Sequence, residues 1–113
     1  MTIKKFHIYI ADLNPRQGTE AGKKRPVVVI QTDLLNNEHP STIILPVTTN
    51  VKKDASILRV HFEPTATGLS KPSDIMIDQI RAIDNNRFKK EVGRLTQAQK
   101  DLVIKNVKTL LFE

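Results

Sequence analysis

Arg25 is the residue whose position in the sequence best suits chemistry. It follows Lys23 and Lys24 at the end of a polar loop, residues 14–25, and precedes Pro26, which opens an apolar run. Proline fixes its own φ and biases the preceding residue toward an extended backbone. We therefore expect the guanidinium to leave the chain from a rigid position where the loop joins a strand. Its planar fork of donors suits the oxygens of a phosphate or a carboxylate.

A second group of polar side chains follows another apolar run. Residues 42–47 are succeeded by Thr48, Thr49 and Asn50, three short hydrogen-bonding side chains at the end of a predicted strand. Such a group suits a ligand site. The alternative is that threonine is simply good strand material, and for a Thr–Thr pair alone that is the better explanation. In the same way, a lone basic loop is most often ordinary solvated surface.

The charge distribution favours a polyanionic partner. The chain of 113 residues has 18 Lys and Arg against 12 Asp and Glu, a net charge of +6. Residues 1–30 hold six of the basic residues and only two acidic ones, so most of the net charge lies there. This asymmetry indicates one basic face. With five Phe and Tyr residues and no Trp, a platform for stacking bases would be small.

Composition also limits the class of protein. The length and a hydrophobic content of 39% predict a single domain over residues 1–113. The absence of cysteine excludes disulfides and thiolate metal sites, and no apolar run of roughly 18 residues or signal-peptide core is present. We therefore expect a cytoplasmic protein without membrane contact. No GxSxG, phosphate-binding Gly-rich loop or metal-spaced histidine pair occurs, so neither cofactor nor metal is expected.

The elements that position these residues are predicted to be short strands. Alternating apolar residues over 5–13 predict a half-buried edge strand on which His7 faces solvent. The β-branched run at 27–30 predicts a central strand covered on both faces. Pro46 cannot donate to a ladder, so the strand at 42–50 should be bulged or at an edge there.

The second half of the chain predicts more strands and then a helix. Strands are expected at 57–63, with His61 facing solvent, at 74–84 and at 91–95. Thr96 and Gln99 match a capping box, followed by apolar residues at helical spacing, namely Val103, Ile104, Val107, Leu110 and Leu111. With single helical turns near 31–41 and 84–88, this pattern predicts a mainly β, α+β fold: a small curled antiparallel sheet or barrel with an amphipathic C-terminal helix.

Several short blocks between about residues 6 and 95 occur in a characteristic order. They are Tyr9-Ile-Ala-Asp-Leu-Asn-Pro, Gly18-Thr-Glu, Lys24-Arg-Pro-Val-Val-Val-Ile-Gln, Leu45-Pro-Val-Thr-Thr, Gly68-Leu, Ser73 and Asp78-Gln-Ile-Arg-Ala-Ile-Asp. This ordered set resembles the MazF/PemK toxin family. The resemblance implies an SH3-like barrel, a homodimer, and metal-independent, sequence-specific cleavage of single-stranded RNA, usually mRNA, by the toxin half of a toxin–antitoxin pair. One departure is Phe6-His7, where members commonly have Gly-Asp; it bears on local contacts and base preference more than on catalysis.

The resemblance also assigns residues. By motif, Arg25 and Thr48 match the family's catalytic pair, and residues 14–25 match its mobile loop over the RNA groove. That loop makes Gly18, Thr19, Glu20 and Lys24 expected substrate-binding residues.

The chemistry of such cleavage agrees with the residue types. The substrate's own 2′-OH attacks the adjacent phosphorus, and the protein manages two protons and the charge on the phosphoryl oxygens. Arg25 fits charge stabilisation, and Thr48 can add a hydrogen bond. An arginine pKa above roughly 12 argues against Arg25 as the base, so His61, Glu20 and water stay open as candidates.

Polar residues around the expected groove should contact RNA and partners. We predict that Thr49, Asn50 and Gln79 contact bases or phosphates. Asp78, Gln79 and Arg81 interrupt an apolar strand, and a symmetric second copy could satisfy them, which predicts a homodimer. The basic loop predicts an acidic antitoxin segment as a partner.

Two other functions fit the same pattern. One is a non-catalytic nucleic-acid-binding barrel, for which the basic groove alone would suffice. The other is a toxin that inhibits a protein target such as a topoisomerase, because a topoisomerase-poisoning family shares this barrel. Those proteins carry an aromatic residue near the C-terminus that engages the target, whereas this chain has no Trp and ends in Leu-Leu-Phe-Glu.

Overall fold

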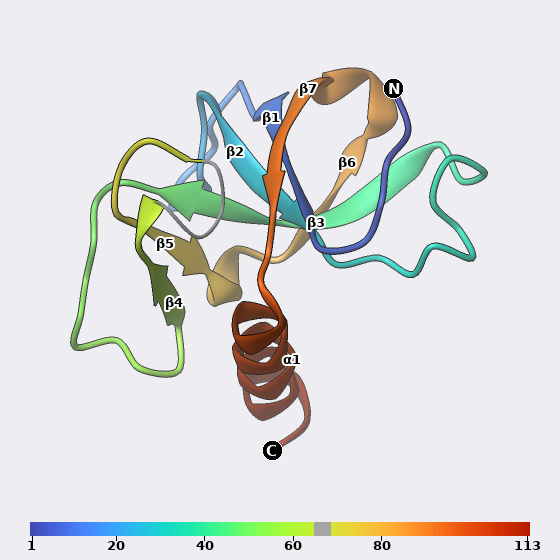
Figure 1. Ribbon diagram of the computed structural model, residues 1–113. Coiled ribbons are helices and arrows are strands. Elements are labelled where there is room, and N and C mark those ends of the chain that lie inside the picture. Colours follow the sequence, from blue (N-terminus) through green and yellow to red (C-terminus); the bar gives the residue numbers. More distant parts are fainter. Residues whose placement is uncertain (65–68) are drawn as a thin grey trace.

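The fold is a curled antiparallel sheet with one α-helix below it (Figure 1). The computed structural model describes residues 1–64 and 69–113; Gly68, part of one sequence block, lies outside them. Its elements in chain order are β1 (His7–Asp12), β2 (Lys24–Val29), β3 (Ser41–Thr48), β4 (Arg59–Phe62), β5 (Ser73–Met76), the 3₁₀ turn η2 (Ile77–Gln79), β6 (Arg81–Asp84), the 3₁₀ turn η3 (Asn85–Arg87), β7 (Phe88–Arg94) and α1 (Gln97–Phe112).

The strands are hydrogen-bonded in the order β4-β5-β3-β2-β1-β7, and β6 also pairs with β3. This arrangement confirms the predicted mainly β fold with a C-terminal helix. The order leaves β4 and β7 as its two ends, so the sheet is curled but open. None of the helices in the described ranges is long and apolar enough to cross a membrane.

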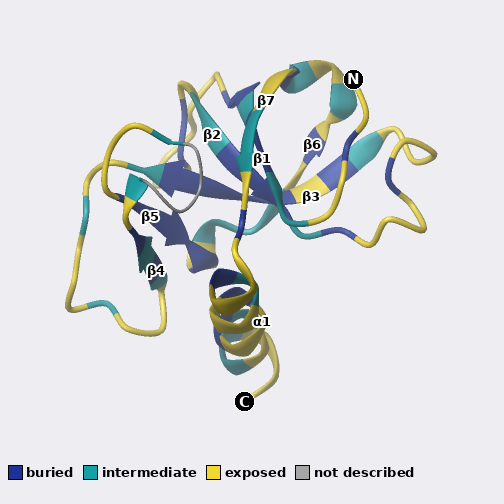
Figure 2. Cartoon of the chain, viewed as in Figure 1, coloured by how far each residue is buried: buried dark blue, intermediate teal, exposed yellow. Residues whose placement is uncertain are grey.

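The central strands are buried (Figure 2), and apolar side chains form one core cluster on each of their faces. Neighbouring residues Ile8 and Tyr9 point to opposite faces of β1, and both have no exposed surface. The prediction of a half-buried edge strand over residues 5–13 is therefore wrong, because β7 covers the outer edge of β1. The prediction of a central strand at residues 27–30 is confirmed, since β2 lies between β1 and β3 with its valines buried.

One side of β3 changes its partner along the strand. The ladder with β6 ends at the pair Ile44–Arg81, and the ladder with β5 begins at Val47. Pro46 lies between them and pairs in regular register with Val27 on the other side. The predicted edge or bulge at Pro46 is therefore wrong: a residue without an N–H is placed where neither ladder on that side requires one.

The same change of partner divides the strand predicted at residues 74–84. β5 and β6 bind different parts of β3, and η2 carries the chain from one to the other. Asp78 and Gln79 thus lie outside the ladders, and Gln79 is hydrogen-bonded to a loop. The homodimer stays a prediction. Of the residues that suggested it, Arg81 has a buried Nη1 atom with no hydrogen-bond partner in the described part of the chain.

α1 begins at the predicted capping box. The N–H of Gln99 donates to Thr96 Oγ1 at 3.3 Å, and the N–H of Thr96 donates to Gln99 Oε1 at 2.7 Å. Val103 is buried against the lower face of the sheet. Ile104 and Leu111 were expected on the same apolar face, but they are 40% and 49% exposed, so the packed stripe is narrower than the sequence predicted.

Phe6 has a left-handed backbone, with φ of +65°, immediately before β1. Glycine accepts this conformation without the clash of a Cβ. Phe6 is nevertheless held on both sides of its backbone: its N–H donates to Val29 O at 2.6 Å, and its carbonyl accepts from Leu95 at 2.9 Å. Its ring packs on the core below the sheet, and Lys5 and Lys100 place ammonium groups over it. Ring packing therefore offsets backbone strain at the residue where the MazF/PemK pattern has glycine.

We predict that Phe6→Gly is more stable than Phe6→Ala by about 1 kcal/mol, because both lose the ring but only alanine keeps the left-handed strain. Urea unfolding measures the difference. Ile43, a position in β3 that pairs in regular register with Ala82 of β6, is the matched control, and there Ala should be more stable than Gly. The same order of Ala and Gly at both positions would contradict this account of Phe6.

Candidate active site

The loop between β1 and β2 is closed at its base by hydrogen bonds. Leu13 N donates to Lys23 O at 2.8 Å, and Lys23 N donates to Asn14 Oδ1 at 2.8 Å. Arg87 of η3 donates through Nη1 to the carbonyls of Asp12 and Asn14, at 2.9 and 2.6 Å. The two ends of the loop are thus held together, and Arg87 connects them to the turn that precedes β7.

Gln79 of η2 holds the middle of the loop. Its Oε1 accepts from Ala21 N at 3.0 Å, and its Nε2 donates to Thr19 O at 3.1 Å. The sequence suggested a contact from Gln79 to bases or phosphates. The structure engages both ends of its amide with loop backbone, so Gln79 helps to shape the pocket, and its contact with RNA stays a prediction.

Two arginines lie together under this loop. Arg25 is half-buried and donates through Nε to Gly22 O at 2.7 Å, while Arg16 Nε donates to Gly18 O at 3.2 Å. A Cβ on Gly22 would stand 2.7 Å from Arg16 Cβ, so only glycine permits this approach. Burial lowers the pKa of Arg25, and the like charge of Arg16 lowers it further. Two cations that repel each other in one place form a site that favours an anion.

Thr48 lies beside Arg25 on the neighbouring strand. The β2–β3 register pairs Val27 with Pro46, and its continuation by two residues sets Arg25 opposite Thr48. Thr48 Oγ1 accepts from Asn50 N at 3.1 Å. A hydroxyl has one hydrogen besides its lone pairs, so Thr48 can still donate to a ligand.

Arg25 contributes to two adjacent pockets. One, of about 220 Å³, lies under the loop and is lined by Asn14, Arg16, Thr19, Glu20, Ala21, Gly22, Lys23, Arg25, Met76 and Gln79. The other, of about 260 Å³, is lined by Lys23, Lys24, Arg25, Pro26, Val47, Thr48 and Thr49. The predicted site residues are therefore brought together, except that Gly18 and Asn50 line neither pocket. Gly18 forms a turn with φ of +57°, and Asn50 lies in the turn after β3.

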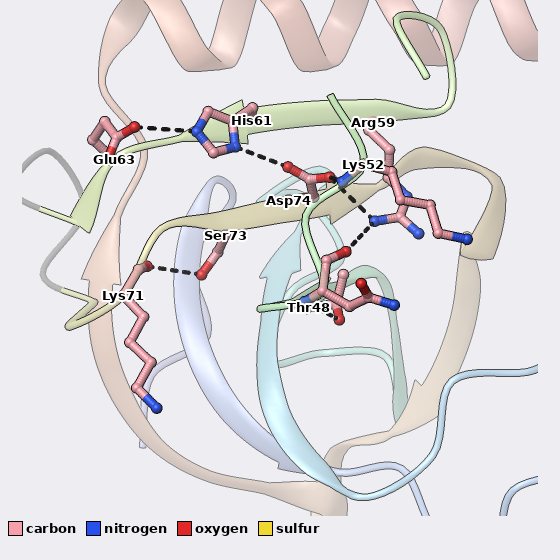
Figure 3. Close-up of polar contacts among 9 residues, drawn as sticks. Thr48, Lys52, Arg59, His61, Glu63, Lys71, Ser73 and Asp74 are labelled. Atoms are coloured by element: carbon pink, nitrogen blue, oxygen red, sulfur yellow. Dashed lines mark hydrogen bonds and ion pairs between the residues drawn. The ribbon is translucent and has the colours of Figure 1, made fainter. Parts of the chain in front are cut away.

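A buried carboxylate extends this row of residues across the sheet (Figure 3). Thr48 on β3 pairs with Asp74 on β5, and Asp74 pairs with His61 on β4. With the register of β2, this gives the order Arg25, Thr48, Asp74 and His61 over four strands. Sequence reasoning singled out neither Asp74 nor Arg16 as a site residue.

Asp74 has no exposed surface and is surrounded by donors. Its Oδ1 lies 3.0 Å from His61 Nδ1, and its Oδ2 accepts from Lys52 N at 2.8 Å and from Arg59 Nη1 at 3.2 Å. Burial alone raises the pKa of Asp74, but these donors outweigh burial and lower it. The pKa of His61 is raised by its hydrogen bond to Asp74 and then by Glu63, which lies 3.2 Å from Nε2. The His61 side chain is 31% exposed, so it partly faces solvent as predicted, and both of its ring nitrogens also have carboxylate partners.

In the described ranges, no group of three or more His, Cys, Asp or Glu side chains is arranged to hold a metal ion.

Comparison with known proteins identifies the family. A family model described as "PemK-like, MazF-like toxin of type II toxin-antitoxin system" matches residues 4–111. The chain belongs to this toxin family. The endoribonuclease MazF of Staphylococcus saprophyticus is 37% identical over 94 residues, which cover 83% of this chain and 78% of the relative.

Solved structures of the MazF family have the same fold. MazF of Deinococcus radiodurans superimposes with a TM-score of 0.85 at 21% identity, covering 100% of this chain and 99% of the other. A MazE–MazF structure from the same organism gives a TM-score of 0.77 at 21% identity, with 98% and 96% covered. The resemblance inferred from the ordered blocks is confirmed.

The pair of His61 and Asp74 predicts how stability depends on pH. A raised histidine pKa stabilises the fold fully below 6.5, the ordinary value, and this contribution is lost as the pH rises through the raised pKa. A lowered aspartate pKa stabilises the fold above 3.8 and is lost as the pH falls through the lowered pKa. We expect His61→Gln to destabilise the protein most between pH 3.8 and pH 6.5, and progressively less as the pH rises above 6.5.

Urea unfolding of the wild type and of His61→Gln across this pH range measures the difference in the free energy of unfolding. His39, an exposed loop histidine whose carbonyl rather than ring is hydrogen-bonded, provides the control substitution His39→Gln. A His61→Gln effect that grows above pH 6.5, or that does not vary with pH, would refute the assigned pair.

Proposed function

We propose that this chain is a sequence-specific endoribonuclease that cleaves single-stranded RNA, principally mRNA, and that a cognate antitoxin neutralises it. Membership of the toxin family and 37% identity to a protein named endoribonuclease MazF support the activity. The observation that carries the proposal is the position of Arg25, a half-buried guanidinium that lines one pocket together with Thr48.

The proposed reaction needs no nucleophile from the protein. The 2′-oxygen of the substrate attacks the adjacent phosphorus, the bond to the 5′-oxygen breaks, and the products carry a 2′,3′-cyclic phosphate and a 5′-hydroxyl. Arg25 Nε is held by Gly22 O, so the two terminal nitrogens are left to bind phosphoryl oxygens. Thr48 donates one further hydrogen bond, and Arg16 adds a second positive charge.

The protons are assigned from the environment of each group. A lowered pKa makes the Arg25 guanidinium a better proton donor to the leaving 5′-oxygen. Glu20 lines the same pocket as Arg25 and is a candidate base, as is water. His61 fits this role less well, because both of its ring nitrogens are engaged by carboxylates.

We predict that Arg25→Ala slows cleavage by about 10² to 10³, as expected for the loss of a preorganised donor to a developing oxyanion. Arg25→Lys should also be slow, because a point charge does not reproduce the planar fork. Thr48→Ala should lose less, and Thr48→Ser should keep part of the rate. The measurement is single-turnover cleavage of a long RNA in EDTA, with mapping of the product ends.

Lys89→Ala, which removes an exposed charge from β7, is the matched control and should cleave like the wild type. Replacing the nucleotide before the cut by its 2′-deoxy form should stop the reaction. A 5′-phosphate product, a strict Mg²⁺ requirement or full activity in Arg25→Ala would refute the mechanism. RNA binding without any cleavage by the wild type would select the non-catalytic binding barrel.

We further propose that an acidic antitoxin segment competes with RNA for the groove around Arg25. The MazE–MazF structures of the Deinococcus radiodurans relative support an antitoxin partner, and residues 16–25 carry a charge of +3 for it to bind. Affinity for the antitoxin should fall as salt is raised, because exposed charge pairs are screened. Titration at two ionic strengths, with RNA cleavage followed in parallel, tests this. Affinity that ignores salt, or binding that leaves cleavage intact, would exclude competition in the groove.

A further inference from the structure

Asp74 is a charged group in a place where charge is costly. It has no exposed surface, and a buried carboxylate stabilises a fold only when donors satisfy it. Replacing a whole buried ion pair by well-packed apolar side chains is often at least as stable, so such a pair is weak evidence of a purely stabilising role. The position of Asp74, directly beside the last residue of β3, points to a purpose connected with Thr48.

Asp74 is linked to both ends of the turn that follows Thr48, directly at Lys52 and through Arg59 at Asn50 (Figure 3). At the far end, Lys52 N donates to Asp74 Oδ2 at 2.8 Å. At the near end, Arg59 Nη1 donates both to that oxygen at 3.2 Å and to Asn50 O at 3.1 Å. Asn50 N in turn donates to Thr48 Oγ1 at 3.1 Å. An unbroken series of contacts therefore joins Asp74 to the threonine hydroxyl.

This series controls the direction in which Thr48 donates. A hydroxyl rotates to suit its partners, and a lone pair held by Asn50 N–H restricts where its hydrogen can point. If the turn moves, Oγ1 loses this acceptor contact and the hydroxyl is free to rotate. A donor that is not preorganised contributes much less to stabilising a transition state.

We propose that Asp74 is a positioning residue for RNA cleavage: through Arg59 and the turn at residues 50–52 it orients the Thr48 hydroxyl toward the phosphate bound at Arg25. This inference rests on the proposed function. It differs from a purely structural role, in which Asp74 only joins β4 to β5.

A double-mutant cycle between Asp74 and Thr48 separates the two roles. Asp74→Asn keeps the size of the side chain but removes one acceptor from the turn. It should lower the single-turnover rate at saturating RNA about tenfold, with little change in KM. In a Thr48→Ala background it should lower the rate no further, because the hydroxyl that it orients is gone. Arg59→Lys keeps the positive charge but not the guanidinium that joins Asp74 to Asn50 O, and it should behave in the same way.

The control is Asp84→Asn. Asp84 pairs with Ser41 at the opposite end of β3 and accepts from Asn86 N, so it has the same chemistry away from the site. It should keep the wild-type rate and KM. If the rate losses of Asp74→Asn and Thr48→Ala multiply in the double variant, or if Asp74→Asn cleaves at the wild-type rate, the proposal is overturned.

Hydrogen exchange keeps this test separate from the proposed function. In Asp74→Asn and in Arg59→Lys the amide of Asn50 should exchange faster, while that of Lys100 in α1, bonded to Thr96 O, should not change. Unchanged exchange at Asn50 overturns the positioning role, whatever the activity. Faster exchange in the two variants, together with a wild type that cleaves no RNA, would refute the proposed function but support the contact between Asp74 and the turn. If Asp74→Asn fails to fold, Arg59→Lys carries the cycle alone.

Discussion

The pairing of β3 with three other strands determines where every residue of the candidate site lies. On one side β3 follows β2, which brings Thr48 opposite Arg25. On the other side it binds first β6 and then β5, which brings Asp74 beside Thr48. A shift of one residue in either ladder would turn Thr48 or Asp74 to the opposite face of the sheet. The buried apolar residues that alternate with them, Val47 and Ile75, make such a shift costly.

The same change of partner also shapes the loop over the site. β5 pairs with the end of β3 and β6 pairs with its beginning, and η2 connects β5 to β6. Gln79 is therefore released from the ladder, and its amide can bind the loop backbone. The loop that holds Arg16 and Arg25 is thus positioned by an irregularity in the sheet as well as by the hydrogen bonds at its own base.

The parts of the site that were predictable are those set by neighbouring residues. Pro26 places Arg25 at the start of a strand, and the capping box places the start of α1. The resemblance to the MazF/PemK toxins supplied the pairing of Arg25 with Thr48. The predictions that were wrong concern strands that pair with distant parts of the sequence. β1 was predicted as an edge strand because the residues of β7 that cover it lie about 80 positions away. Asp74 and His61 meet only because of the β4–β5 register, which no local pattern indicates.

The two halves of the row of residues differ in how their charges are balanced. At Asp74 the carboxylate is paired with Arg59 and His61, and His61 also contacts Glu63, so charges of both signs are present there. At Arg25 burial lowers the pKa, and the like charge of Arg16 lowers it further. In the free protein, like charges therefore repel each other at the Arg25 end of the row, and a bound anion would relieve this repulsion. A phosphodiester backbone and an acidic protein segment both supply such an anion, and they would have to occupy the same place, since Arg25 lines both pockets. Under the proposed function, an RNA phosphate and an acidic antitoxin segment that both bind at Arg25 would exclude each other without a change of conformation.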